Sequence, residues 1–94
     1  MKKIYLIGEK ESPEARGKFK EAEENLTAAG NTVINPMKII DALPVGISNS
    51  EFIVVATELI RISDAVFFIE GYEHDLIASL ERANAQRLEK EILV

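Results

Sequence analysis

The stretch Ala65-Val66-Phe67-Phe68-Ile69 is apolar at every position and is followed at once by Glu70-Gly71. A continuous apolar run of this length is typical of a strand buried on both faces, as the central strands of a parallel sheet are. Parallel strands need crossover connections, because a hairpin turn returns an antiparallel strand. This stretch therefore predicts a strand in the centre of a parallel sheet, whose neighbours are reached through crossovers.

Three other short segments predict strands. Residues 3–8 contain an unbroken apolar run, residues 32–35 hold Thr, Val and Ile before a proline, and residues 91–94 close the chain with aliphatic side chains. Each is short, and each contains the β-branched or aliphatic residues that suit a half-buried or buried strand.

The segments between these strands have helical spacing. The first helix is expected to have Ser12 as its N-cap and to end at Gly30 in the left-handed conformation. The second is expected to begin at Ser50, after a possible single turn around residues 39–42. Its predicted core-facing positions are Phe52, Val55, Ala56, Leu59 and Ile60.

A third helix is expected to begin near Asp75 and to bury Leu76, Leu80, Ala83 and the stem of Arg87. Strands and helices then alternate along the chain. Right-handed crossovers turn this alternation into a three-layer α/β sandwich around a four-stranded parallel sheet. We expect the strand order 2-1-3-4 and one domain over residues 1–94.

Composition and charge limit the class of protein. The net charge is −5 with both signs mixed along the chain, so the basic face that a nucleic-acid polymer requires is missing. There is no cysteine, which excludes disulfides and thiolate metal sites and fits a reducing cytoplasm. No apolar run suits a signal peptide or a membrane span. We expect a cytoplasmic protein that binds neither nucleic-acid polymers nor membranes.

The topology predicts where a ligand binds. In open parallel sheets this is beyond the carboxyl ends of the strands at the switch point, here between the first and third strands. Gly8 and Glu9 follow the first strand, and Gly71, Tyr72 and Glu73 follow the third. The two glycines would let a ligand approach the backbone.

The same region is acidic, because Glu70 and Asp75 join Glu9 and Glu73 there. Acidic side chains disfavour a polyphosphate, and the glycine-rich fingerprints of dinucleotide and triphosphate sites are absent. A hard cation held by Glu70, Glu73 and Asp75 is one alternative. The only histidine, His74, has no partner pattern. We expect no cofactor and no resident metal.

Three segments together resemble the nucleoside 2-deoxyribosyltransferases, in particular the short uncharacterised bacterial and phage proteins related to them. They are residues 3–6, residues 29–36 with the sequence AGNTVINP, and the stretch from Ser63-Asp64-Ala65-Val66 through Gly71-Tyr72-Glu73 to Glu81. The resemblance spans nearly the whole chain. It implies a flavodoxin-like or Rossmann-like fold, a nucleoside or nucleotide ligand, and a ligand site that includes Asn35.

The resemblance also implies catalytic residues. In that family a glutamate on the third helix attacks the anomeric carbon of the deoxyribose, and an aspartate six residues earlier handles protons or contacts the base. Glu81 matches the nucleophile, Asp75 matches the aspartate, and Tyr5 matches a tyrosine near the nucleophile. Glycosyl transfer through a covalent intermediate needs one carboxylate as nucleophile and a second group to assist the leaving base.

Each of these three residues also has a structural interpretation. Glu81 could be a helix-surface glutamate paired with Arg82 or Arg87. Asp75 could be a plain N-cap. Tyr5, in the middle of a strand, could be part of the core.

Four positions depart from the family pattern. Ile7 and Glu9 stand where relatives place Ser and Pro, Ala56 stands where an aspartate is expected, and Ile77 replaces a glycine that makes room for the sugar. The first hypothesis is therefore a nucleoside-binding or nucleotide-binding domain whose catalytic site is degenerate or lost.

Two alternatives belong to other classes. One is an active transferase or hydrolase that cleaves the N-glycosidic bond of (deoxy)nucleosides or their monophosphates, with Glu81 as nucleophile. The other is a non-catalytic interaction protein that oligomerises through its apolar second helix. Family members commonly complete the pocket across a subunit interface, so the resemblance implies a homo-oligomer in all three cases.

Overall fold

The computed structural model describes residues 1–94 and contains a single four-stranded sheet with the order β2-β1-β3-β4. Every neighbouring pair is parallel, which confirms the predicted sheet and its 2-1-3-4 order. The strands are β1 Lys3–Ile7, β2 Thr32–Ile34, β3 Ala65–Phe68 and β4 Glu91–Leu93. The helices are α1 Ala15–Ala28, α2 Pro36–Ala42, α3 Asn49–Arg61, the 3-10 turn η1 Tyr72–His74 and α4 Leu76–Arg87.

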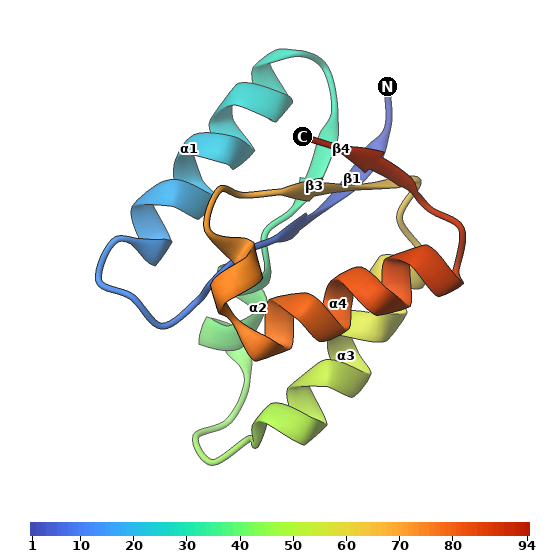
Figure 1. The fold of residues 1–94 in the computed structure, drawn as a ribbon. Coiled ribbons are helices and arrows are strands. Elements are labelled where there is room, and N and C mark those ends of the chain that lie inside the picture. Colours follow the sequence, from blue (N-terminus) through green and yellow to red (C-terminus); the bar gives the residue numbers. More distant parts are fainter.

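The helices form the outer layers of the sandwich. Helix α1 covers one face of the sheet, and α3 and α4 cover the other (Figure 1). Side chains alternate between the faces along β1, so that Tyr5 and Ile7 point toward α3 and α4 while Leu6 points toward α1. None of the helices has the length and apolar composition that crossing a bilayer requires.

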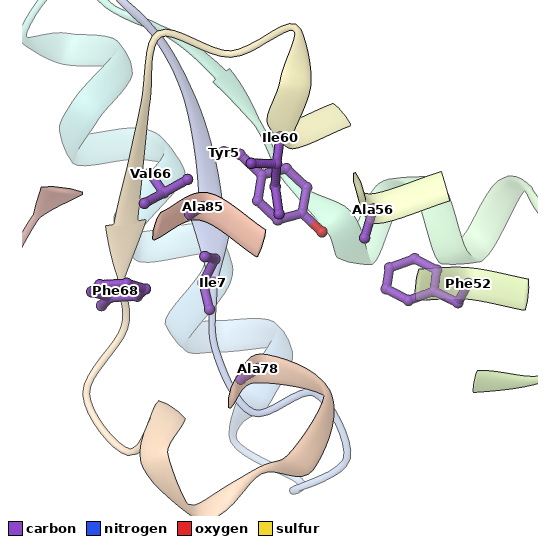
Figure 2. Close-up of a cluster of buried hydrophobic side chains, with 9 residues drawn as sticks. All are labelled: Tyr5, Ile7, Phe52, Ala56, Ile60, Val66, Phe68, Ala78 and Ala85. Atoms are coloured by element: carbon purple, nitrogen blue, oxygen red, sulfur yellow. The ribbon is translucent and has the colours of Figure 1, made fainter. Parts of the chain in front are cut away.

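The larger hydrophobic cluster lies between the sheet and the helices α3 and α4 (Figure 2). Its nine buried residues are Tyr5, Ile7, Phe52, Ala56, Ile60, Val66, Phe68, Ala78 and Ala85. The smaller cluster, beneath α1, consists of Leu6, Phe19, Met37 and Ile69. Strand β1 supplies buried residues to both clusters. Strand β3 supplies Val66 and Phe68 to the larger cluster, and its partly buried Phe67 packs against the smaller one, as predicted for strands buried on two faces.

Two helix starts differ from the prediction. Helix α1 begins at Ala15, because Ser12 forms a preceding turn in which its carbonyl accepts the Ala15 N–H at 3.1 Å. Helix α3 is capped by Ser48 and not by Ser50. Ser48 has a glutamate three residues later, Glu51, and the two residues form a reciprocal capping box.

The end of α1 agrees with the prediction, and α2 is longer than the prediction. Gly30 has φ +95° and ends α1 as predicted. The single turn expected around residues 39–42 is the complete short helix α2, which Pro36 opens at its first position.

The buried face of α4 was predicted wrongly. Leu76 is 74% exposed, Leu80 is 44% exposed, and Ala83 and Arg87 are also exposed. The face that packs on the sheet contains Ala78, Glu81 and Ala85 instead. Two small alanines let the helix approach the strands closely, and the glutamate between them is paired inside the core.

Candidate functional site

A cleft of about 720 Å³ lies beyond the carboxyl end of β1, on the side of the sheet where ligand binding was predicted. The β1–α1 loop, the α2–α3 loop and the N-terminus of α4 form its walls. Its lining includes Lys10, Ser12, Arg16, Leu43, Pro44, Ser48, Phe52, Asp75 and Ile77. The volume falls within the range of about 300–1,000 Å³ that is usual for small-molecule sites.

Glu81 lies inside the protein next to this cleft but does not line it, and its side chain is 0% exposed. Its Oε2 accepts a hydrogen bond from the Tyr5 hydroxyl at 2.5 Å, and its Oε1 accepts one from Lys10 Nζ at 2.7 Å. The Lys10 side chain is only 9% exposed. Both carboxylate oxygens of Glu81 are therefore occupied by partners from the β1 segment.

Lys10 has two further contacts that hold it in place. Its Nζ donates to the Gly8 carbonyl at 3.2 Å and lies 5.7 Å from the centroid of the Phe52 ring. Lys10 and Phe52 both line the cleft. Lys10 thus lies between the cleft and the Glu81 carboxylate, and Phe52 packs beside its ammonium group.

Burial shifts the pKa values of Glu81 and Tyr5. Removal from water raises the pKa of Glu81, and the Lys10 ammonium and the Tyr5 hydroxyl oppose that rise. Burial and the neighbouring Glu81 also raise the pKa of Tyr5 well above its usual range. Tyr5 is therefore a neutral phenol whose O–H group donates a hydrogen bond to Glu81.

Asp75 lies in the cleft and is also the N-cap of α4. Its Oδ2 accepts the Ala78 N–H at 2.8 Å, which confirms the capping interpretation. The surface interpretation of Glu81 was wrong, because the residue is buried and its partners are Tyr5 and Lys10. Tyr5 belongs to the core and also contacts Glu81, so both of its interpretations are compatible with the structure.

The four departures from the family pattern have different surroundings. Ile77 lines the cleft, whereas Ala56 is fully buried and packs in the cluster that contains Tyr5 (Figure 2). Ile7 belongs to the same buried cluster. The Glu9 carboxylate accepts backbone N–H bonds from Ser12, at 2.8 Å, and from Glu11. Hydrogen bonding to Ser12 lowers the pKa of Glu9, so this charged residue shapes the β1–α1 loop.

The six predicted ligand-binding residues do not border the main cleft. Asn35 caps α2 by accepting the Met37 N–H at 2.9 Å and donates to Glu23 at 3.1 Å. Tyr72 stacks on Phe68 with ring centroids 4.6 Å apart, and Glu73 is exposed. Their ligand-binding roles stay predictions.

Gly71 and Glu9 border a smaller hollow of about 210 Å³, together with Glu70 and His74. Gly71 has φ +94°, which residues other than glycine rarely adopt. This conformation turns the chain from β3 into η1. The structure contains no group of three or more His, Asp or Glu side chains arranged to hold a metal ion.

Gly8 faces protein and not the cleft. A Cβ atom at this position would lie 3.0 Å from Phe19 Cζ and 3.1 Å from Ile69 Cβ. The glycine therefore lets α1 pack closely against the end of β1, which explains its presence without a ligand.

We expect the Gly8→Ala variant to lose about 1–3 kcal/mol of stability, because the added methyl group overfills a packed core. Gly17 in α1 is a matched control, since nothing lies within 4 Å of the Cβ that an alanine would add there. Gly17→Ala should gain about 0.5–1 kcal/mol from the higher helix propensity of alanine. Urea unfolding of both variants measures the difference, and equal stabilities would contradict the packing role of Gly8.

The sequence interpretation missed Lys10 and the α2–α3 loop. The sequence does indicate a role for Lys10, because it is a lone basic residue between Glu9 and Glu11, just after the first strand. The loop of residues 43–48 has no periodic pattern that would place it over the cleft.

Fold and cleft define the chain as a parallel α/β domain with a small-molecule-sized cleft beyond the carboxyl end of its central strand β1. The model of a family described as a domain of unknown function, DUF4406, matches residues 2–94, and the chain belongs to this family. No curated protein and no solved structure matches the chain.

Proposed function

We propose that the protein binds a nucleoside or nucleotide in the cleft next to Lys10 and does not turn it over efficiently. One observation carries this proposal: the Glu81 carboxylate is buried, has both oxygens paired, and is separated from the cleft by Lys10. A nucleophile must bring an oxygen to about 3–3.5 Å from the carbon that it attacks. Glu81 would first have to give up a buried ion pair.

The cleft itself supports a ligand with a flat aromatic part and polar groups. Phe52, Leu43 and Pro44 give it apolar surface, and the Asp75 carboxylate provides an acceptor for an N–H or O–H group. Arg16 is already held by Asp41 through two hydrogen bonds, at 2.8 and 2.5 Å. The cleft thus offers an aromatic ring for stacking and an acceptor for hydrogen bonds, while its Arg16 guanidinium is already paired.

A thermal-shift screen against deoxynucleosides, nucleosides and their monophosphates tests the proposal, with chromatography of each mixture for released base. We expect at least one of these compounds to raise the melting temperature while no free base forms. A ligand at about a hundred times its dissociation constant should add about 2.7 kcal/mol of stability, which such a screen detects.

Asp75→Asn is the matched variant for this screen. Asparagine is as good an N-cap as aspartate, so the stability of α4 should be kept while the charge is lost. A hydrogen bond to a charged group contributes about 1.5–3 kcal/mol, so we expect ligand affinity to fall about tenfold or more. Unchanged affinity would place the ligand elsewhere, and the absence of any stabilising compound would contradict nucleoside binding.

The second candidate function is transfer or hydrolysis of an N-glycosidic bond. The Tyr5–Glu81 hydrogen bond favours it, because the resemblance implies a tyrosine beside the nucleophile. Under this alternative Lys10 moves away when substrate binds and leaves one oxygen of Glu81 free. Released base that disappears in Glu81→Gln would support the alternative against simple binding.

A further inference from the structure

The charged side chains that line the cleft differ in whether a partner within the chain compensates them. The basic ones are Lys10 and Arg16, and the acidic ones are Glu11, Asp41 and Asp75. Lys10 pairs with the buried Glu81 at 2.7 Å, and Arg16 pairs with Asp41 at 2.5 Å. Neither Glu11 nor Asp75 takes part in an ion pair. The uncompensated charges of the cleft are therefore all negative.

The ammonium group of Lys10 still has a donor for a ligand. A lysine carries three N–H donors. In Lys10 one of them goes to Glu81 Oε1 at 2.7 Å and another to the Gly8 carbonyl at 3.2 Å. No other acceptor in the chain receives a hydrogen bond from Lys10, which lines the cleft. The remaining N–H is therefore available to a ligand oxygen or nitrogen, while the positive charge is already compensated by Glu81.

Burial makes this compensation effective. The side chain of Glu81 is 0% exposed and that of Lys10 is 9% exposed, so little water screens their attraction. The pair presents a dipole to the cleft and not a net positive charge. Asp75 lies close enough to act on the pair, because burial is the main cause that raises the pKa of Glu81 and the Asp75 charge is a further one. A phosphate group beside Lys10 would therefore meet the charge of Asp75 without a free cation.

We propose that Glu81 sets the charge selectivity of the cleft by neutralising Lys10, so that the cleft binds an uncharged nucleoside and rejects its 5′-monophosphate. A phosphate monoester carries about two negative charges at neutral pH, and like charges brought together suppress the binding of a wrong ligand. Glu81 acts through Lys10 and touches no ligand itself. The inference rests on the proposed function, because it concerns the ligand of the same cleft.

Matched pairs of ligands test this selectivity in the wild type. Deoxyadenosine and its 5′-monophosphate, and the corresponding pairs for the other common bases, are titrated calorimetrically against the intact chain. In a pair that binds, we expect the monophosphate to bind about tenfold more weakly, or weaker still, at about 0.01 M salt. The difference should narrow at about 1 M salt, where the Debye length falls from about 30 Å to about 3 Å.

Glu81→Gln tests the role of Glu81. The amide keeps the volume of the side chain but leaves the charge of Lys10 uncompensated, so the preference for the nucleoside should fall about tenfold. Asp75→Asn should shift the preference in the same direction, because it removes a negative charge and keeps the N-cap of α4. Glu23→Gln is the matched control. It removes the same charge from the Lys38–Glu23 pair, also 2.7 Å, whose residues border a different hollow.

The results that would overturn the inference differ from a failure of the proposed function. A monophosphate that binds the wild type as tightly as its nucleoside would overturn the inference while nucleoside binding stands. So would an unchanged preference in Glu81→Gln, once circular dichroism shows it folded, or an equal change in Glu23→Gln. If Glu81→Gln is unfolded, an unchanged preference in Asp75→Asn overturns the inference. Binding of neither member of any pair would contradict the proposed function itself and this inference with it.

Discussion

Replacing Lys10 by methionine is expected to destabilise the fold by about 3–5 kcal/mol at neutral pH. The variant leaves the Glu81 carboxylate buried without its cationic partner, and the lost attraction is not replaced by water because Glu81 is 0% exposed. Methionine fills most of the volume of the lysine stem, so the loss reports charge and not packing. Urea unfolding measures it.

The loss should depend on pH in a defined direction. Burial already raises the pKa of Glu81, and removing Lys10 takes away the main opposing influence, so the pKa should rise further. A carboxyl group whose pKa is higher in the folded state contributes stability that is fully present below its unfolded pKa. That stability is lost as the pH rises through the folded value. Lys10→Met should therefore be closest to the wild type in mild acid and furthest from it in mild alkali.

Lys38→Met is the control for this experiment. The Lys38–Glu23 pair has a similar distance, 2.7 Å, but Lys38 is 69% exposed, so its loss should change stability little. If Lys10→Met and Lys38→Met behave alike, Lys10 does not hold Glu81 in solution. Glu81 would then not be separated from the cleft by Lys10.

The second large effect is expected for Glu81→Ala, which should also cost about 3–5 kcal/mol. The variant leaves the Tyr5 hydroxyl and the Lys10 ammonium without their buried acceptor and opens a cavity beneath α4. Glu81→Gln should be milder, because the amide keeps the volume and still offers an oxygen to Tyr5. Parallel urea unfolding of the two variants tests this, and equal losses would show that the hydrogen bonds contribute little.

This difference decides how the catalytic alternative can be tested. Loss of activity in Glu81→Ala would follow from unfolding as readily as from loss of a nucleophile. Glu81→Gln removes the nucleophilic charge with less damage to the fold. It is therefore the variant in which base release should be measured.

The sheet could be predicted from the sequence because its signals are local. The apolar run at residues 65–69 and the alternation of strand and helix patterns leave few topologies open, and the handedness of the crossovers selects among them. The proximity of Tyr5 to Glu81 was anticipated only through the family resemblance. Nothing in the spacing of two residues so distant in the sequence indicates contact.

The buried face of α4 could not be predicted from the sequence, because the helix exposes its leucines and buries less hydrophobic residues. Leucines at positions 76 and 80 favour one face, whereas the helix buries Ala78, Ala85 and a glutamate. A buried glutamate is acceptable only with partners, and those partners, Tyr5 and Lys10, come from the other end of the chain. These long-range contacts determine which face of α4 is buried, and the residues of α4 alone do not indicate them.

The most direct test of the proposed function is to trap a covalent intermediate on Glu81. A 2′-fluorinated nucleoside slows the breakdown of a glycosyl-enzyme ester, so the protein is saturated with one that raises its melting temperature and is then weighed by intact mass spectrometry. We predict an unchanged mass, because Tyr5 and Lys10 keep the carboxylate away from the sugar. A glycosyl adduct on residue 81 that is absent in Glu81→Gln would contradict the account and identify the protein as an active transferase or hydrolase.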